Sequence, residues 1–298
     1  MQPKITVIGS INMDLVTEAY KRPKAGETIL GKKFSTIPGG KGANQAVAAA
    51  RLGGKVTMIG CVGEDLFGKE LLIRLEAEGV MTDHVRSVPS SKTGTAAITL
   101  AEGDNSIIVV PGANNELTEE MIVQNEEVIA DSDVVIVQLE IPLPTVVKAA
   151  TIAHHHGVKV ILNPAPIQKL PDKLIDLAYV ITPNEHEYKV LIKNYSGDLS
   201  KLERKLIITK GGDGTVFYDK GKQVHLPSYH VDVVDTTGAG DSFNGGLAVQ
   251  LAKGLSLKES CRYANAVGAL SVMKLGAQSG MPTDTEVRQF IQKNGDNQ

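Results

Sequence analysis

The chain has 298 residues, of which 42% are hydrophobic and 22% charged, and its formal net charge is -3. This composition is typical of a globular protein, and it gives no reason to expect nucleic acid or an anionic membrane as a partner. The longest apolar runs fall short of the ~18 residues needed to span a bilayer. The N-terminal segment "MQPKITVIGS" lacks the long apolar stretch and cleavage site of a signal peptide, so we expect a cytoplasmic protein.

Short β-branched runs recur along the whole chain and predict the strands of one main sheet. Helical patterns lie between several of them, for example at residues 65–79 and 144–157. Strands this apolar, separated by helices, predict an α/β fold with a central, mostly parallel sheet and helices on both faces. We expect a single domain over residues 1–298. The runs are "KITVIG", "VTMIGCVG", "DVVIVQLE", "VKVILNPAP", "YVITPNE" and "LIITKGG".

Four further strand-like segments have no helix of their own. They lie at about residues 11–20, 27–36, 93–100 and 105–112, and the "AEGD" between the last two suits a hairpin. Together they predict a small sheet that projects from the main one as a lid. Four strands alone cannot bury both faces, so we also expect a homodimer that forms through this lid.

The cysteines and a histidine triplet could invite a metal or disulfide interpretation. Cys61 and Cys261 are far apart in apolar runs, which is typical of buried, reduced thiols in a cytosolic protein. His154 to His156 are consecutive residues of a predicted helix, where their side chains point in different directions and cannot converge on one ion. We expect a solvated helix end there.

The segment "GGKGANQAVAAARLGG", residues 39–54, is a glycine loop that opens an alanine-rich helix. A helix-capping loop alone would explain the last glycines, but it gives no reason for Lys41 and Asn44 beside the first ones. Bare backbone next to two polar side chains suits a ligand rich in hydroxyl groups.

A second glycine segment, "DTTGAGDSFNGG", covers residues 235–246. It is not a dinucleotide fingerprint, because Phe243 stands where that motif needs glycine, and the chain has no Walker A loop, because Gly42 follows Lys41. The amides at the start of the following helix would attract an anion. Asp241 could then be a general base beside a phosphoryl group, or it could simply cap the helix, and spacing leaves both open.

The two glycine segments resemble the signatures of the ribokinase-like carbohydrate kinases, also called the phosphofructokinase B family. "GSINMD", "LNPAP", "TPNEHE" and "KLGAQSGMP" follow in the family's order, so the likeness covers nearly the whole chain. The resemblance implies ATP-dependent phosphorylation of the 5-hydroxyl of D-ribose, with ATP, Mg²⁺ and K⁺. Phosphorylation of deoxyribose or of another pentose or nucleoside, or a weakly active sugar-binding protein on the same fold, are the alternatives.

The resemblance also implies residue roles. Asp241 would be the general base, beside an anion hole formed by Gly238, Ala239 and Gly240. The positions that match the sugar site are Asn12, Met13 (as a spacer), Asp14, Gly40, Lys41, Gly42, Ala43, Asn44 and Glu140. Those that match the ATP site are Asn184, Thr209, Lys210, Gly211, Gly212, Asp213, Gly214, Gly240 and Asn265. Glu187 would organise magnesium near the phosphates, and a monovalent-cation site would comprise Asp235, Thr237, Ser271, Lys274, Gly276 and Gly280.

One segment departs from the family's pattern. Only six residues, 199–204, lie between "PNEHEYKVLIKNYSGD" and "KLIITKGG", where the family places a full helix and an amphipathic segment. We therefore expect the crossover at residues 190–206 to be shortened or lost. Because the strand that leads to Thr209 depends on this crossover, we expect a weakened nucleotide side of the site.

Overall fold

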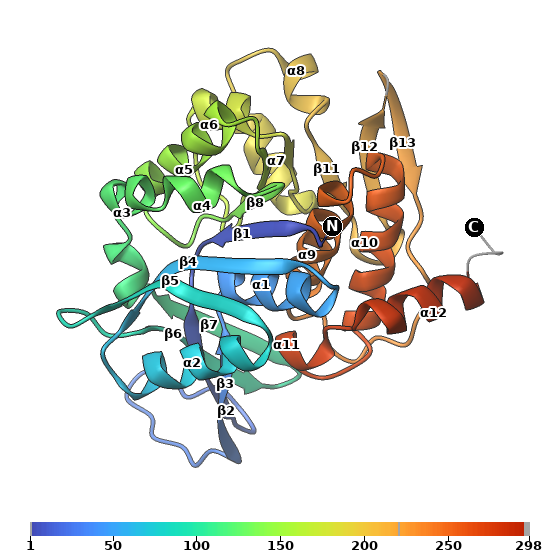
Figure 1. Ribbon diagram of the computed structural model, residues 1–298. Helices are drawn as coiled ribbons and strands as arrows, with labels where there is room; N and C mark the ends of the chain where they lie inside the picture. The colour runs from blue at the N-terminus through green and yellow to red at the C-terminus, as the bar shows by residue number, and fades with distance from the viewer. Residues whose placement is uncertain (1, 220, 295–298) are drawn as a thin grey trace.

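The computed structural model describes residues 2–219 and 221–294. Its centre is a six-stranded sheet in the order β10-β9-β8-β1-β4-β5, in which all neighbouring strands run parallel (Figure 1). This confirms the parallel sheet predicted from apolar strands that alternate with helices. The strands are β1 (Lys4–Ile8), β4 (Lys55–Gly63), β5 (Val80–Val88), β8 (Val134–Val137), β9 (Lys159–Leu162) and β10 (Val180–Ile181).

Helices cover both faces of this sheet, because alternate residues of each strand are buried on opposite sides. In β1, Ile5 and Val7 pack into a core cluster with α1 (Lys41–Arg51), α2 (Leu66–Ala77), α9 (Ala239–Ala252) and α10 (Leu257–Ser271). Ile8 packs into a second cluster, with α3 (Glu119–Gln124), α4 (Glu126–Ala130), α5 (Leu143–His155) and α6 (Asp172–Leu177). Figure 1 shows these two helical layers on either side of the strands.

The predicted lid is present as a separate four-stranded sheet in the order β3-β2-β6-β7 (Figure 1). Its strands are β2 (Asn12–Glu18), β3 (Lys33–Gly39), β6 (Gly94–Ala101) and β7 (Asp104–Val110). The hairpin between β6 and β7 turns at Glu102 and Gly103, which both have positive φ. Strand β3 begins six residues later than the segment predicted for it, residues 27–36. Its bounds follow from its pairing with β2, which runs from Asn12↔Gly39 to Glu18↔Lys33.

The crossover at residues 190–206 is present and short, which agrees with a shortened element and not with a lost one. It contains α7 (Glu185–Asn194) and the short helix α8 (Leu199–Glu203), whose Leu202 is fully buried. The chain then enters an antiparallel sheet of β11 (Ile207–Thr209), β12 (Thr215–Asp219) and β13 (Lys222–Leu226). Two parallel bridges, Ile181↔Leu206 and Asn184↔Thr209, join this sheet to the end of β10.

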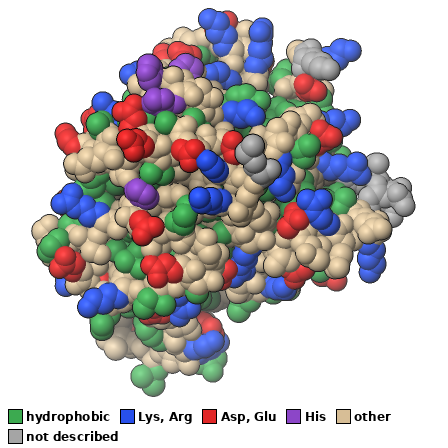
Figure 2. All heavy atoms as spheres, viewed as in Figure 1, with side chains coloured by type: hydrophobic (Ala, Val, Ile, Leu, Met, Phe, Trp, Pro, Cys, Tyr) green, Lys and Arg blue, Asp and Glu red, His purple; other side chains and the backbone are tan. Residues whose placement is uncertain are grey.

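The remaining described elements are the 3₁₀ helices η1 (Gly112–Glu116) and η2 (Gly211–Asp213), and the helices α11 (Ala277–Gly280) and α12 (Asp284–Asn294). Cys61 and Cys261 are buried and free, as expected. The triplet ends α5, where His156 lies 2.8 Å from Glu126. Over the ranges 2–219 and 221–294, no helix combines the length and apolarity that a membrane span requires. Acidic and basic side chains are interspersed over the face seen in Figure 2.

Candidate active site

The matched sequence motifs converge at the carboxyl edge of the central sheet. Asn12 follows β1, Glu140 follows β8, and Asn184 follows β10. The N-termini of α1 and α9 approach the same edge, with the lid beside it (Figure 1). Ligands of open α/β sheets bind at this edge, so the fold places the candidate residues where a site is expected.

Asp241 lies at the centre of this group, and both of its carboxylate oxygens accept hydrogen bonds from amide side chains. Asn44 Nδ2 donates to Oδ2 at 3.0 Å, and Gln45 Nε2 donates to Oδ1 at 2.9 Å. Asp241 is the third residue of α9, and the N-cap Gly238 receives no side-chain hydrogen bond. The helix-capping interpretation of Asp241 is therefore wrong in this structure.

The start of α9 forms the predicted cluster of backbone amides. Gly238 adopts a left-handed conformation (φ 77°), and a Cβ there would lie 2.8 Å from the Cβ of Ala277, so this position requires glycine. The Ala239 amide donates to the carbonyl of Thr236 at 3.2 Å. The remaining first-turn amides lack helical partners and point to where an anion would sit.

Charges around Asp241 shift several pKa values. Burial raises the pKa of Asp241, opposed by the charge of Lys41 and by the hydrogen bonds from Gln45 and Asn44. Burial alone would lower the pKa of Lys41, but the carboxylates of Asp241, Glu140 and Glu187 outweigh it and raise that pKa. The site therefore holds a buried base next to a lysine that stays charged.

Three carboxylates of the predicted site lie close enough to interact, namely Asp14, Glu140 and Asp241. Burial, and then the charges of Glu140 and Asp241, raise the pKa of Asp14 to about 7. Its carboxylate lies over Gly39, where an added Cβ would meet both oxygens at 2.5 Å. Asn12 is held by Asn114, whose Nδ2 donates to Asn12 Oδ1 at 2.7 Å. Asn12 and Asp14 on β2 thus lie on the side of the lid that approaches Glu140, after β8.

Met13 does not belong to this set. Strand alternation turns its side chain to the other face of β2, where it is fully buried in the core. Gly40, Gly42 and Ala43 act through their backbone. A Cβ on Gly40 would lie 2.7 Å from the Asn12 nitrogen, and Ala43 N–H donates to the Ser10 carbonyl at 2.9 Å.

A cavity of about 470 Å³ lies on the other side of Asp241 and contains most of the predicted nucleotide positions. Asn265 Nδ2 donates to the carbonyls of Leu226 and Pro227, both at 3.3 Å, and so fixes one wall. The Lys210 ammonium lies 3.7 Å from Glu185, outside the cavity lining. Asp213 also lies outside this lining. The predicted residues that line the cavity are Asn184, Thr209, Gly211, Gly212, Gly214, Gly240 and Asn265.

A smaller cavity of about 180 Å³ contacts Asp241, Lys41 and Glu187. Glu187 forms a capping box with Asn184, in which Oε2 accepts from the Asn184 amide at 2.8 Å. Its other oxygen has no bond within this box. Carboxylate oxygens suit Mg²⁺, which usually keeps several waters beside one or two protein ligands. The donor set of this cavity therefore fits a phosphate-bound magnesium ion.

The loop matched to a monovalent-cation site is also assembled. Asp235 Oδ2 accepts from the Gly276 amide at 2.8 Å, and Asp235 Oδ1 accepts from the Thr237 amide at 2.9 Å. A Cβ on Gly280 would lie 2.3 Å from the carbonyl oxygen of Ser271. The Lys274 side chain lies 3.7 Å from Glu286, so only its backbone oxygen would face an ion in the loop. This cradle of backbone oxygens fits a large monovalent cation.

Several side chains of the site were not identified from the sequence. Ser10 Oγ donates to Glu140 Oε2 at 2.5 Å. Gln45 also donates to Asn163 at 3.1 Å, and its oxygen accepts from Gln138 at 2.6 Å. Gln45 and Asn163 lie in quoted motifs, so the motifs could have indicated them. Gln138 lies in an apolar strand pattern, where nothing marks it.

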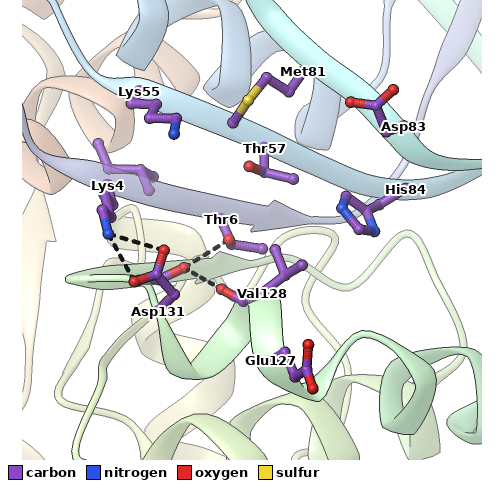
Figure 3. A pocket seen from close by; sticks show the side chains of 12 residues that line it. Lys4, Thr6, Lys55, Thr57, Met81, Asp83, His84, Glu127, Val128 and Asp131 are labelled. Carbon is purple, nitrogen blue, oxygen red and sulfur yellow. Dashed lines mark hydrogen bonds and ion pairs between the residues drawn. The ribbon is translucent and has the colours of Figure 1, made fainter.

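Another cavity, of about 400 Å³, lies at the opposite, amino edge of the sheet (Figure 3). Lys4 and Asp131 line it and form an ion pair at 2.7 Å. Thr6 hydrogen-bonds Ser132 at 2.7 Å nearby. This cavity lies away from the carboxylates described above and contains none of the predicted site residues.

Comparison with known proteins identifies the class that this fold and site define. The model of the pfkB family of carbohydrate kinases matches residues 2–284. The chain belongs to the pfkB family of carbohydrate kinases.

Within that family, several of the similar proteins are ribokinases. A ribokinase from Bacillus subtilis is 49% identical over 289 residues, covering 96% of this chain and 99% of the relative. A ribokinase from Lactococcus lactis is 46% identical over 288 residues, covering 96% of both. The structure of Arabidopsis thaliana ribokinase complexed with ribose and ATP has a TM-score of 0.90 at 34% identity, covering 98% of this chain and 99% of that one.

Proposed function

We propose that this protein is an ATP-dependent sugar kinase that transfers the γ-phosphoryl group of ATP to the 5-hydroxyl of D-ribose and yields ribose 5-phosphate. The observation that carries the proposal is the position of Asp241. It is buried, it lines the small cavity with Lys41 and Glu187, and amide donors hold both of its oxygens. The names of the similar ribokinases, and ribose and ATP in the Arabidopsis complex, support the same reaction.

The chemistry follows from the arrangement of the carboxylate and the start of α9. Asp241 accepts the proton of the sugar hydroxyl while the hydroxyl oxygen attacks the γ-phosphorus of ATP. The bond from that phosphorus to the β–γ bridging oxygen breaks, and ADP leaves with this oxygen. First-turn amides of α9, from Gly238 to Gly240, compensate charge on the transferred group. The raised pKa of Asp241 suits a base that must take up a proton near neutral pH.

Two cations complete the proposal. Glu187 would hold Mg²⁺, through its waters, beside the phosphates, and the ion would neutralise phosphate charge there. The loop from Asp235 to Gly280 would hold K⁺ with backbone oxygens. Because a potassium ion would brace the loop that carries Gly276 against Gly238, we expect higher activity in potassium than in sodium.

Asp14 would select the sugar. Its carboxylate would accept hydroxyl groups of the ring, so deoxyribose would leave one buried acceptor unpaired. An unpaired buried acceptor costs roughly 1–3 kcal/mol, which corresponds to about a ten- to hundredfold preference for ribose. Deoxyribose is thus the second candidate substrate.

A coupled ADP-release assay with ATP and a panel of ribose, deoxyribose and other pentoses tests the proposal. We expect turnover with ribose, the stated preference over deoxyribose, and a higher rate in KCl than in NaCl at fixed ionic strength. Equal efficiency with both sugars would favour the deoxyribose alternative. Sugar binding without turnover would favour a sugar-binding protein on the same fold.

We also propose a homodimer formed through the lid, and action in the cytoplasm. The exposed apolar strand β7 supports the first, since it is an edge strand that pairs with β6 on one side and with none of the described strands on the other. Two free, buried thiols and a requirement for ATP suit a reducing cytoplasm.

A further inference from the structure

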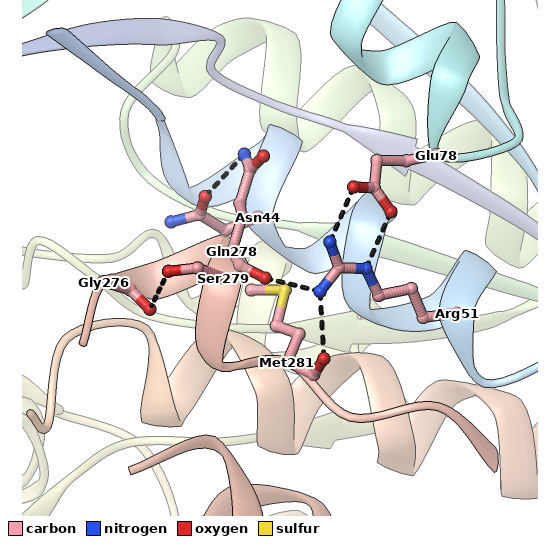
Figure 4. Close-up of polar contacts among 7 residues, drawn as sticks. All are labelled: Asn44, Arg51, Glu78, Gly276, Gln278, Ser279 and Met281. Carbon is pink, nitrogen blue, oxygen red and sulfur yellow. Dashed lines mark hydrogen bonds and ion pairs between the residues drawn. The ribbon is translucent and has the colours of Figure 1, made fainter. Parts of the chain in front are cut away.

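Arg51, the last residue of α1, links three parts of the chain that are distant in sequence (Figure 4). Its Nε and Nη2 donate to the two carboxylate oxygens of Glu78, at 2.7 and 2.6 Å. Its Nη1 donates to the carbonyls of Gln278 and Met281, at 2.6 and 2.9 Å. This bidentate pair fixes the plane of the guanidinium group. Glu78 therefore orients Arg51 so that Nη1 points to the carbonyls of α11 and its C-cap.

The short helix α11 in turn contacts the site. Gln278 Nε2 donates to Asn44 Oδ1 at 3.0 Å, a contact visible in Figure 4. The preceding residue, Ala277, packs directly against Gly238 at the start of α9. A helix of four residues has little stability of its own, so its position depends on what holds its ends. At one end Arg51 binds the carbonyls, and at the other Asp235 binds the Gly276 amide.

The bond from Gln278 decides which way the Asn44 amide faces. Because Asn44 Oδ1 accepts from Gln278, its Nδ2 is left to donate to Asp241 Oδ2. The reverse orientation would place the Asn44 oxygen against a carboxylate oxygen, which is repulsive when Asp241 is ionised. The other oxygen of Asp241 has a parallel arrangement, in which Gln138 donates to Gln45 and Gln45 donates to Asp241.

We propose that Gln278 and Arg51 are positioning residues for the general base. Gln278 orients Asn44 as a donor to Asp241, and Arg51, aimed by Glu78, holds the carbonyl of Gln278 so that its side chain reaches Asn44. This inference rests on the proposed function, in which Asp241 takes the proton from the sugar. Without either residue the Asn44 amide is held less firmly, so its hydrogen bond to the Asp241 carboxylate weakens, the pKa of the base rises and turnover falls.

The first experiment compares Gln278→Leu and Gln278→Glu with wild type in the ribose assay between pH 5 and 9. Loss of one donor to a carboxylate should move the acid limb of kcat/KM upward by about one pH unit and lower kcat about tenfold. Gln278→Glu keeps the shape of the side chain but replaces its donor by an acceptor. The new carboxylate would compete with Asp241 for Asn44 Nδ2, so kcat should fall further. If Gln278 serves only packing, the glutamate variant should match wild type.

Gln289→Leu is the matched control, since it makes the same change of side chain outside the site. Gln289 is an exposed residue of α12. This variant should keep the wild-type pH profile and kcat. Thermal unfolding of each variant shows whether it is folded at the assay temperature.

A second experiment tests the link through Arg51. Arg51→Lys retains the positive charge but cannot make the bidentate pair with Glu78. It should shift the acid limb of the kcat/KM profile in the same direction as Gln278→Leu. Both changes act on the Asn44 amide. The kcat of the double variant Arg51→Lys, Gln278→Leu should therefore be only slightly lower than that of the more impaired single variant. Arg74→Met, which removes the surface pair with Glu70 on α2, is the control for loss of an ion pair.

The outcomes separate the inference from the proposed function. If wild type does not phosphorylate ribose, the proposed function fails. If wild type is active and the Gln278 variants keep its acid limb, the positioning role of Gln278 is overturned. If Arg51→Lys and Gln278→Leu lower kcat by factors that multiply in the double variant, Arg51 does not act through Gln278.

Discussion

At the scale of single residues, the site is built on one carboxylate whose charge is supported by a lysine and by two neutral amides. Both oxygens of Asp241 accept from Asn44 and Gln45, and Lys41 is the cation that opposes the effect of burial on its pKa. Amide donors keep the carboxylate oriented without saturating it, since each oxygen retains a further lone pair for the sugar hydroxyl.

The clearest test of this arrangement is Asp241→Asn. An amide has nearly the same shape but cannot accept the hydroxyl proton, so kcat should fall at least about a hundredfold while ribose KM changes little. Steady-state kinetics with ribose and ATP measures both values. Turnover near that of wild type would show that Asp241 is not the base.

The titration of Asp14 should make the unfolding free energy depend on pH. Its pKa is raised from 3.8 to about 7 in the folded protein, by burial and by the charges of Glu140 and Asp241. Between these two values the folded state binds the extra proton, so the unfolding free energy that this group supports is fully present below pH 3.8 and is lost as the pH rises through 7. Asp14→Asn should therefore be more stable relative to wild type at pH 8 than at pH 4.

Urea unfolding of both proteins at the two pH values measures this difference. Asn12→Ala provides the control, because it changes the neighbouring sugar position without removing a titrating group. A difference between Asp14→Asn and wild type that is the same at both pH values would contradict the raised pKa of Asp14.

The sequence identified the residues with distinctive chemistry better than those that hold them. Asp241, Lys41 and Glu187 stand inside quoted motifs, and all three line one cavity. The contact between Gln278 and Asn44 joins residues 234 positions apart. No local pattern encodes such a pair, because it depends on how α11 packs after the chain has folded.

At the scale of elements, the crossover between β10 and β11 shows how a short segment can replace a long one. α8 has only five residues, but Leu202 is fully buried in the core beside Leu191 of α7. Length alone predicted a shortened or lost element, because the sequence does not reveal that one leucine and two backbone bridges are enough to place β11.

We expect Leu202→Ala to lower the unfolding free energy by about 2–5 kcal/mol, as for other fully buried leucines. It should also weaken ATP binding, since the bridge between Asn184 and Thr209 lies in the nucleotide cavity wall. Denaturant unfolding and nucleotide titration measure the two effects. Leu199→Ala, on the same helix but 46% exposed, should change stability by less than about 1 kcal/mol. Equal losses in both variants would show that α8 is not anchored by Leu202.

The boundaries of β3 illustrate a different limit of prediction. Local β propensity favoured residues 27–36, whereas the strand observed runs from Lys33 to Gly39. Its partner β2 determines the register, and the amide of Lys32 already bonds the carbonyl of Glu18 at 2.7 Å. The parallel order of the central sheet, in contrast, followed from the alternation of apolar strands and helices.

At the scale of the whole molecule, the lid carries apolar side chains on both of its faces. Cross-strand pairing places Val109 on the same face as Ala96 and Asp14, whereas Ile108 lies on the opposite face. Ile108 is 69% exposed and Ile107 52%. An edge strand this apolar is a site for association with another chain, which supports a second copy as its partner.

Replacement of this apolar surface by charge should therefore abolish the dimer. The double variant Ile107→Lys and Ile108→Lys should sediment as a monomer where wild type sediments as a dimer. Val123→Lys is the control, since Val123 is a 49% exposed apolar residue of α3, outside the lid. A wild-type protein that is monomeric across assay concentrations would exclude the dimer.

The grouping of Asp14, Glu140 and Asp241 also bears on how the reaction ends. Besides burial, the charge of Glu140 raises the pKa of both Asp14 and Asp241, and the charge of Asp241 also raises the pKa of Asp14. A neutral sugar adds no charge to this group, but its phosphorylated form brings up to two negative charges to the same place. Coulomb repulsion in a partly desolvated site then favours departure of the product over its retention. The charges that hold the sugar hydroxyls would therefore also promote release of the sugar phosphate and limit inhibition by it.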